Sequence, residues 1–480
     1  MLMKEERNHR LAFRGILLLT LVMVAACAGT RAAQVVPTAT LPSALIDDID
    51  AIVAEVLEAT GVPSASIAVV HDGAISLTKA YGLARIESPM PAATTMRYAI
   101  GSISKQFTAT AVAMLAEDGK LSLDDTVGRF FPEVTQAGDI TLRQLLSHTS
   151  GIRDYWPQDY VPPSMLEPIT THALLERFAS QPLDFEPGSQ YQYSNTGYVL
   201  AGAIVEKVGS QSLTDFLQAR VFTPLGMESV VDIDQASLTE GDPTGYQRFA
   251  LGPAREAPDE GRGWLFAAGP LAMTAEDLGR WNAAFIDGEV PGAGVVRELT
   301  REIVLDSGVG TGYGLGVTID LEGKRRVIGH GGEVSGFTAT NLIYPEERIA
   351  VTVLSNQDAA NASETIADEI VEILLAHNAT ANAATLDQVK AIFDGLRRGT
   401  LDRLLFTPNG NHYFSEVALA DIKASLKRIG SVKDIKQTYE GPRGGFTTRV
   451  YSVETKKKTL HVVTRTDDDG KLEQYTVAVE

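Results

Sequence analysis

The sequence predicts an α+β fold in which helices flank an antiparallel sheet beside a mostly helical lobe, with a small α+β domain at the C-terminus. Strand-like runs lie near both ends of residues 43–377 and helix-like runs lie between them, which indicates one sheet assembled from distant parts of the chain. The 480 residues are 44% hydrophobic and 21% charged, so the chain is too apolar for a disordered protein and too long for one ordinary domain.

The individual elements follow from periodicity and turn signals. Residues 43–60 carry apolar side chains at helical spacing, and a hairpin is expected where residues 65–70 and 74–81 meet at His71-Asp72-Gly73. Further helices are expected at residues 107–115, 142–146, 196–208, 213–221 and 363–377. Late strands are expected at residues 313–317, 326–329, 338–344 and 349–355.

A second domain is predicted at the end of the chain. Residues 378–385 are small and polar, so we expect a linker between a first domain at residues 43–377 and a second at residues 386–480. The last segment has two helical patterns followed by three strand-like runs, and about 95 residues is within the usual range for a domain. No motif in this segment indicates its role.

The first 27 residues have the pattern of an export signal. Basic residues precede an apolar run at residues 16–26, which is shorter than the roughly 20 residues needed to cross a membrane. The run ends at Val24-Ala25-Ala26-Cys27, which resembles a bacterial lipobox, so we predict lipidation at Cys27 and a tether at residues 28–42. Ordinary cleavage at Ala26-Cys27-Ala28 is the alternative. Either way, we expect an exported protein of the cell envelope, and lipidation would anchor it to a bacterial membrane.

Composition and missing motifs exclude several classes of protein. A net charge of −19 disfavours nucleic-acid binding, because phosphates would be repelled over most of the surface. A single Cys excludes a disulfide framework and a thiolate zinc cluster. The sequence lacks H-E-x-x-H, G-x-G-x-x-G, G-x-x-x-x-G-K and G-x-S-x-G, which disfavours metal, nucleotide and α/β-hydrolase chemistry.

A Ser and a Lys lie three residues apart where a helix is expected to begin. In Gly101-Ser102-Ile103-Ser104-Lys105, the two side chains share one helical face, so Lys105 can reach the Ser102 hydroxyl. A desolvated Lys of lowered pKa can take the proton of a Ser nucleophile, and a helix N-terminus favours negative charge. An S-x-x-K pattern alone is expected roughly once by chance in a chain of this length.

Two later motifs support a catalytic reading of that pair. Tyr193-Ser194-Asn195 supplies a phenol that can relay a proton and an amide that can orient a substrate. His330-Gly331-Gly332-Glu333 follows a predicted strand, where a backbone N–H can form half of an oxyanion hole. The structural alternatives are an aromatic turn capped by Asn195 and a Gly-rich hairpin carrying a surface His.

Taken in this order, the three motifs resemble those of the serine β-lactamase and penicillin-binding protein family, in the class C-like branch that includes DD-carboxypeptidases and esterases. The resemblance covers roughly residues 45–377 and implies the β-lactamase/transpeptidase fold. Other stretches share it: residues 145–152, 224–227, 268–271 and 313–316.

The resemblance implies a role for each catalytic position. Ser102 is the expected nucleophile, Lys105 its activating partner, and Tyr193 the general base in acylation. The backbone N–H groups of Ser102 and Glu333 are the expected oxyanion hole. The family needs no metal ion or organic cofactor, and none is expected here.

The same resemblance implies three substrate-binding positions, Asn195, His330 and Gly332. His330 stands where a K-T-G motif has Lys. A His is only partly charged at neutral pH, so it holds a substrate carboxylate less firmly than a Lys does. We therefore expect an exported serine hydrolase that forms an acyl-enzyme with D-Ala-D-Ala-type peptides, β-lactams or small esters, with peptidoglycan among its possible partners. The alternative is a non-catalytic lipoprotein that binds or senses penicillin or peptidoglycan.

Overall fold

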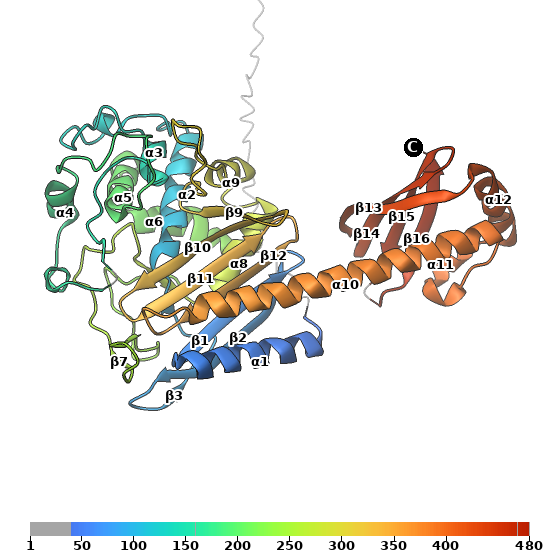
Figure 1. Ribbon diagram of the computed structural model, residues 1–480, viewed down its shortest axis with the longest axis horizontal. Coiled ribbons are helices and arrows are strands. Elements are labelled where there is room, and N and C mark those ends of the chain that lie inside the picture. Colours follow the sequence, from blue (N-terminus) through green and yellow to red (C-terminus); the bar gives the residue numbers. More distant parts are fainter. Residues whose placement is uncertain (1–39, 159, 468, 480) are drawn as a thin grey trace, which may run out of the picture. The chain divides into compact units, whose positions relative to one another are not determined.

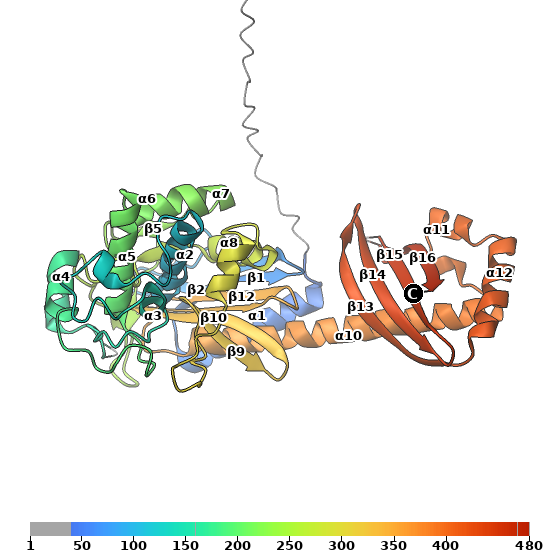
Figure 2. The same cartoon turned by 90° about the horizontal axis from the view of Figure 1, so that it is seen from above.

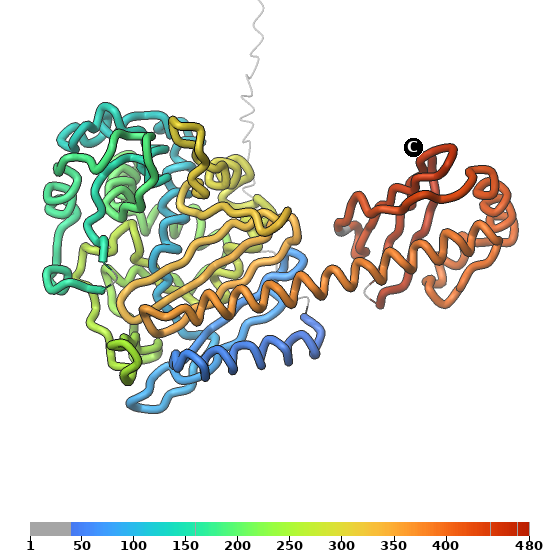
Figure 3. Tube along the Cα trace, in the orientation of Figure 1, coloured from blue at the N-terminus to red at the C-terminus, as the bar shows by residue number. Residues whose placement is uncertain are grey.

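The principal sheet joins the two ends of the first domain. The computed structural model describes residues 40–158, 160–467 and 469–479. Its seven-stranded antiparallel sheet has the order β3-β2-β1-β12-β11-β10-β9. In Figure 3, the blue early strands lie beside the orange late ones. The strands are β1 (Ser64–His71), β2 (Ala74–Arg85), β3 (Met90–Pro91), β9 (Thr318–Glu322), β10 (Arg325–Val334), β11 (Phe337–Tyr344) and β12 (Ile349–Ser355). This confirms the predicted sheet built from distant segments.

Helices cover both faces of this sheet (Figures 1 and 2). On β1, Ile67 and Val69 pack in one hydrophobic cluster with α1 (Ser43–Thr60) and the first half of α10 (Ala362–Arg398). The intervening Ala68 and Val70 pack in a second cluster with α8 (Ala275–Asp287). Successive strand residues point to opposite faces, so a strand covered on both sides is apolar throughout.

The middle of the chain forms the predicted helical lobe around α2 (Ser104–Glu117). Every residue of α2 from Ser104 to Leu115 is buried, which explains why its sequence is apolar on all sides. The other helices are α3 (Leu142–Leu146), α4 (Thr171–Phe178), α5 (Asn195–Gly209), α6 (Leu213–Leu217), α7 (Thr223–Leu225) and α9 (Ala293–Leu299). Short strands complete it: β4 (Tyr98–Ala99), β5 (Val231–Asp232), β6 (Tyr246–Gln247), β7 (Arg255–Glu256) and β8 (Leu271–Met273).

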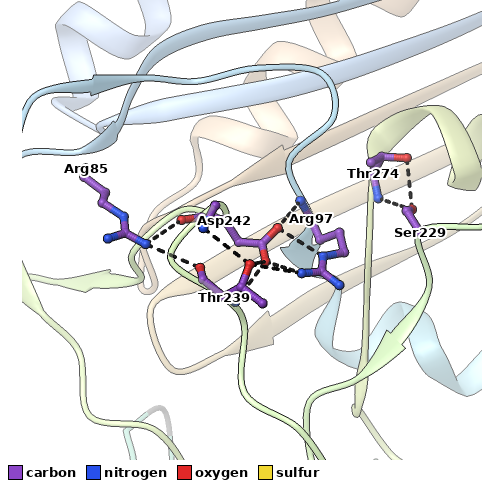
Figure 4. A network of polar contacts seen from close by, with 7 residues as sticks. Arg85, Arg97, Ser229, Thr239, Asp242 and Thr274 are labelled. Carbon is purple, nitrogen blue, oxygen red and sulfur yellow. Dashed lines mark hydrogen bonds and ion pairs between the residues drawn. The ribbon is translucent and has the colours of Figure 1, made fainter.

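A polar network holds the segment that leads into the nucleophile motif. Asp242 accepts hydrogen bonds from the backbone N–H of Arg97 at 3.0 Å and from its Nε at 3.0 Å, and it pairs with Nη2 at 2.5 Å (Figure 4). Thr239 donates to the same carboxylate through its N–H and hydroxyl. Arg97 directly precedes β4, so this buried carboxylate anchors the chain four residues before Gly101.

One late strand differs from the prediction. Residues 313–317 were expected to be a strand, but the strand is β9 at Thr318–Glu322. The preceding glycines form a loop that passes close to other backbone, since a Cβ on Gly316 would lie 2.7 Å from the Lys105 carbonyl oxygen. The glycines therefore mark a close backbone approach, with isolated β-bridges at Gly310 and Tyr313 instead of a continuous strand.

The C-terminal residues form their own small core. A four-stranded antiparallel sheet packs with the second half of α10 around Phe393, Tyr451 and Tyr475. Its elements are α11 (Pro408–Tyr413), α12 (Glu416–Leu426), β13 (Val432–Arg443), β14 (Phe446–Thr455), β15 (Thr459–Thr466) and β16 (Leu472–Val479).

The segment predicted to be a linker is helical. Residues 378–385 lie inside α10, and residues 379–384 are exposed. The Ala-rich composition favours helix, and no Pro or Gly interrupts it, so small polar residues did not produce an irregular connection. The division into domains at residues 43–377 and 386–480 stays a prediction.

The membrane-related predictions concern the other end of the chain. The export signal at residues 1–27, Cys27 and residues 28–39 of the tether lie outside the described residues. Within the three described ranges, no helix combines the length and the apolar character needed to cross a membrane.

Candidate active site

The predicted Ser–Lys pair is in direct contact. Ser102 lies in a short 3₁₀ helix (Gly101–Ile103), and Lys105 lies in the first turn of α2. The Lys105 Nζ atom is 2.9 Å from the Ser102 Oγ atom. The Lys105 side chain is fully buried. The structure therefore brings together the two groups that the S-x-x-K motif predicted.

Two further contacts orient Lys105. Its Nζ also donates to Asn195 Oδ1 at 2.8 Å and to the Ala268 carbonyl oxygen at 2.7 Å. Neither oxygen can donate in return. When Lys105 is neutral, its two N–H bonds are therefore occupied by these acceptors, and its lone pair is directed at the Ser102 hydroxyl.

The protonation state of Lys105 suits this arrangement. Burial lowers its pKa to about 7, although the charge of Asp154 acts in the opposite direction. A substantial fraction of Lys105 is then neutral near pH 7 and able to accept a proton. The geometry favours Lys105 as the group that takes the Ser102 proton.

Tyr193 lies next to the pair with its hydroxyl buried. Lys105 Nζ is 5.0 Å from the centre of its ring. In the described part of the chain, the Tyr193 hydroxyl makes no hydrogen bond of normal length and angle. Burial raises the pKa of Tyr193 far above its ordinary value, while the nearby Ser102 acts to lower it. A phenol held in its neutral form is better suited to donating a proton to a leaving group than to acting first as a base, so the acylation role expected for Tyr193 stays a prediction.

Asn195 is fixed by Asp154. The Asp154 carboxylate accepts from the Asn195 backbone N–H at 2.9 Å and from its Nδ2 at 3.3 Å. It also accepts from the Trp156 N–H at 3.3 Å. Asp154 thus forms an Asx turn and lines the cavity at the same time. The Asn195 amide already binds Lys105 and Asp154, and it contributes to the cavity wall.

His330 does not occupy the expected place in the site. It is buried on β10, and it is absent from the cavity lining. Its Nδ1 lies 2.5 Å from the Gly331 carbonyl oxygen, so Nδ1 carries the proton, and Nε2 accepts from the Tyr313 hydroxyl at 2.8 Å. Burial lowers its pKa to about 4. A neutral imidazole 6.2 Å from the Tyr193 ring is suited to packing behind that ring rather than to binding a substrate carboxylate.

Gly332 and Glu333 bring strand β10 against the nucleophile. A Cβ on Gly332 would lie 1.9 Å from the Ile100 carbonyl oxygen and 3.3 Å from the Ser102 nitrogen. A Cβ on Gly101 would lie 2.6 Å from the Glu333 nitrogen. The backbone segments that carry the Ser102 and Glu333 nitrogens therefore pack closely at two glycines. The oxyanion hole formed by their N–H groups stays a prediction.

These groups open onto one cavity of about 850 Å³. Ser102, Tyr193 and Asn195 line it together with an aromatic wall that includes Trp156, Tyr160 and Phe249. Its charged lining residues are Asp154, Arg248, Glu333 and Asp358.

The cavity carries an excess of negative charge. Arg248 uses its guanidinium on the backbone carbonyls of Thr60 and Gly61, at 3.1 Å for Thr60. Beside Asp358, which accepts from the Gly336 N–H at 3.0 Å, Glu260 accepts from the Ser335 N–H at 2.8 Å. Burial raises the pKa of Glu260 to about 7 and raises that of Asp358 as well. A positively charged ligand in the cavity would favour the ionised form of Asp358, which lines it.

The sequence did not identify several of these groups. His148 and Ala268 lie in two of the stretches that share the family resemblance, which was a signal, but no role followed from it. Asp358, Glu260 and Arg248 lie outside every motif that the sequence analysis identified. Within the described residues, no group of three or more His, Cys, Asp or Glu is arranged to hold a metal ion.

Comparison with known proteins identifies the family. The model of the family described as Beta-lactamase matches residues 49–376, about two thirds of the chain. The chain belongs to this Beta-lactamase family. It is a serine hydrolase with the β-lactamase/transpeptidase fold, as the three motifs predicted.

Individual relatives share this part of the chain. A protein named D-aminopeptidase from Brucella anthropi is 29% identical over 318 residues, which cover 65% of this chain and 59% of that protein. The chain thus spans less than two thirds of that relative. A D-stereospecific amidohydrolase from a Streptomyces species is 27% identical with a TM-score of 0.57, over 66% of this chain and 96% of the other. A penicillin-binding protein homologue from Pyrococcus abyssi shares the fold at 21% identity and a TM-score of 0.61, over 91% of this chain and 98% of the other.

Proposed function

We propose that this protein hydrolyses amide bonds through an acyl-enzyme at Ser102, and that its substrates carry a free ammonium group on the acyl side. Amino acid amides and short peptides with a free amino terminus meet this description. The observation that carries the proposal is the 2.9 Å contact between Lys105 Nζ and Ser102 Oγ at the wall of a negatively charged cavity.

The acylation step follows from the contacts of Lys105. Neutral Lys105 accepts the Ser102 proton as Oγ forms a bond to the substrate carbonyl carbon, and the carbonyl oxygen becomes an oxyanion facing the N–H groups of Ser102 and Glu333. When the C–N bond breaks, the leaving nitrogen takes a proton from the Tyr193 hydroxyl, which is replenished from the Lys105 ammonium. Ser102 is then an ester, and an amine has left.

Deacylation reverses the roles. A water molecule attacks the ester carbonyl carbon and gives a proton to the Tyr193–Lys105 pair. When the C–O bond to Ser102 Oγ breaks, the Tyr193–Lys105 pair returns this proton to Oγ, and a carboxylic acid is released. The same two N–H groups stabilise the second oxyanion, so one arrangement serves both halves of the reaction.

The charge of the cavity supports substrates with an ammonium group. Asp154, Glu333 and Asp358 outnumber Arg248, whose guanidinium is engaged with backbone carbonyls. A unit charge about 4 Å from a carboxylate gains roughly 1–4 kcal/mol, depending on the local dielectric. A β-lactam or a D-Ala-D-Ala peptide presents a carboxylate, which this lining disfavours and which the neutral His330 does not offset.

The relatives support amide substrates of D configuration. The proteins that are 29% and 27% identical to this chain are named a D-aminopeptidase and a D-stereospecific amidohydrolase. We therefore place D-amino acid amides and D-aminoacyl peptides ahead of the D-Ala-D-Ala-type peptides, β-lactams and small esters that the sequence alone suggested. Export and a lipid anchor at Cys27 remain proposals that rest on the pattern of residues 1–27.

A panel of paired substrates tests the proposal. D- and L-amino acid amides, their N-acetyl derivatives, a chromogenic cephalosporin and p-nitrophenyl acetate are compared by kcat/KM. We expect free-amine D-amides to exceed their N-acetyl counterparts by at least tenfold. Ser102→Ala should abolish turnover, while the control Ser189→Ala at an exposed turn should not. Equal rates with and without the acetyl group, or binding of one equivalent without turnover, would contradict the proposal, the latter in favour of the sensing alternative.

A further inference from the structure

The Tyr193 hydroxyl is buried and, among the described residues, lacks a hydrogen bond of normal length and angle, although the nearby Ser102 acts to lower its pKa. A proton relay requires the phenol oxygen to stay within reach of both Ser102 and the leaving group. Contacts of the ring and of the adjacent backbone must therefore hold it in place.

His148 supplies both kinds of contact. The N–H of Gln192, just before Tyr193, donates to the His148 carbonyl oxygen at 2.9 Å. The N–H of Ser194, just after Tyr193, donates to the His148 Nδ1 at 3.1 Å. The imidazole itself lies against the Tyr193 ring, with centroids 4.1 Å apart and an interplanar angle of 32°. His148 thus holds the backbone on both sides of Tyr193 and supports its ring.

The protonation state of His148 follows from these bonds. Because Nδ1 accepts from a backbone N–H, the proton of the neutral ring lies on Nε2, which is buried and has no hydrogen-bond partner in the described part of the chain. Burial and the nearby Lys105 and His330 keep its pKa well below the ordinary value. The imidazole therefore stays neutral while Lys105 changes charge beside it.

The conformation of His148 is energetically unfavourable, which indicates a role beyond forming its own backbone turn. His148 has a left-handed backbone with φ of +60°, which Gly or Asn adopts more easily, and its Nε2–H is unsatisfied. The imidazole also contacts the ring of Tyr313, at 4.9 Å between centroids, and the Tyr313 hydroxyl donates to His330. The His148 ring thus contacts both the tyrosine of the second motif and the tyrosine that binds the third.

We propose that His148 is a positioning residue that holds the Tyr193 phenol in the orientation needed to protonate the leaving group. This proposal rests on the proposed function, since it concerns a step in the cleavage of an amide. His148 transfers no proton in this step, and its main contact with Tyr193 is the one between the two rings.

The test uses two variants that remove different contacts. His148→Asn keeps a polar acceptor and suits the left-handed backbone but removes the ring, whereas His148→Phe keeps the ring and removes the acceptor. An amide needs a proton on its leaving nitrogen, whereas p-nitrophenolate leaves without one. For His148→Asn, we expect kcat/KM on an amide to fall by at least 30-fold and kcat/KM on a p-nitrophenyl ester by less than threefold, because kcat/KM reports acylation and excludes the shared deacylation step. His148→Phe should restore the amide-to-ester ratio to within fivefold of wild type.

A double-mutant cycle separates positioning from a general structural role. In a Tyr193→Phe background, His148→Asn should have less than a threefold further effect, because both changes remove the same function. Equal losses on amide and ester, or a full effect of His148→Asn in that background, would overturn the proposal. If His148→Asn fails to fold by circular dichroism, His148→Phe and its cycle with Tyr193→Phe carry the test, and a loss of the amide-to-ester ratio beyond fivefold then overturns it.

Failure of the proposed function gives a different result. If the wild-type chain hydrolyses esters but no amide, the proposed function fails, and the same cycle is measured on an alkyl ester, whose alkoxide needs a proton, against the p-nitrophenyl ester. The expected ratios for His148 are unchanged.

Discussion

The Gly332 Cα and the Ile100 carbonyl oxygen approach so closely that a Cβ on Gly332 would lie 1.9 Å from that oxygen. Neither atom belongs to a flexible side chain, so any substitution must move β10 or the 3₁₀ helix that carries Ser102. Gly331, one residue earlier, would place its Cβ 4.0 Å from the nearest backbone oxygen. The two adjacent glycines thus differ sharply in the space around them.

This difference predicts that Gly332→Ala separates Glu333 from the nucleophile. We expect kcat on an amide to fall by at least 100-fold, because the two oxyanion N–H groups lose their alignment, and the free energy of unfolding to fall by about 1–3 kcal/mol. Gly331→Ala is the matched control and should stay within threefold of wild type. Kinetics and urea unfolding of both variants measure this, and similar behaviour of the two would argue against the close approach.

The pKa of Lys105 predicts the acid limb of the pH profile. Only neutral Lys105 accepts the Ser102 proton, and its pKa is about 7, so kcat/KM should rise as pH increases through about 7. His330, with a pKa of about 4, should contribute no change between pH 5 and 8. A profile measured from pH 5 to 9 on an uncharged ester avoids titration of the substrate; a flat profile would exclude Lys105 as the base.

A variant of Asp154 tests whether the pKa of Lys105 controls the acid limb. Its charge raises the pKa of Lys105, so Asp154→Asn should move the acid limb to lower pH. The same substitution keeps an acceptor for the N–H of Asn195. Asp387→Asn, on an exposed part of α10, serves as the control and should leave the limb in place. A shift to higher pH in Asp154→Asn would mean that another group controls the limb.

The charge of Asp358 predicts a selective effect on substrates with an ammonium group. Asp358→Asn should lower kcat/KM for a free-amine amide about fivefold, corresponding to about 1 kcal/mol, and leave its N-acetyl derivative unchanged. Measuring both substrates with wild type and variant at low and high salt tests this. Equal losses on the two substrates would indicate a structural role for Asp358.

The Arg97–Asp242 pair predicts the behaviour in acid. Burial acts to raise the pKa of Asp242, but hydrogen bonds from Arg97 and Thr239 hold it at about 2, below the ordinary 3.8. A lowered folded-state pKa stabilises the protein above pH 4, and this contribution is lost as the pH falls toward 2. Asp242→Asn should therefore be less stable than wild type at pH 7 by about 1–3 kcal/mol, with the difference shrinking between pH 4 and 2. Unfolding followed by fluorescence at several pH values measures it, and a constant difference would contradict this account.

Part of the fold could be predicted because local patterns suffice for it. The apolar runs of β1 and β12 indicate strands that are covered on both faces, and α1 shows helical spacing. The prediction failed where composition was ambiguous. Residues 378–385 favour a linker by their polarity and a helix by their alanines, and the neighbouring turns of α10 extend the helix through them.

The sequence by itself determined the identity of the reactive groups. Ser102 and Lys105 share a helical face because they are three residues apart, and this local relation does not depend on the rest of the chain. The order of the three motifs was sufficient to indicate the family.

Only the tertiary structure decided how those groups act. The direction of the Lys105 lone pair depends on Asn195 and on the Ala268 carbonyl, which lie 90 and 163 residues away. The charge of the cavity depends on Asp358 and Arg248, which belong to none of the three motifs. The position of His330 outside the cavity lining depends on its hydrogen bond with Tyr313. Burial and long-range contact set pKa values and orientations, and a sequence pattern records neither, because both arise only when distant segments exclude water together.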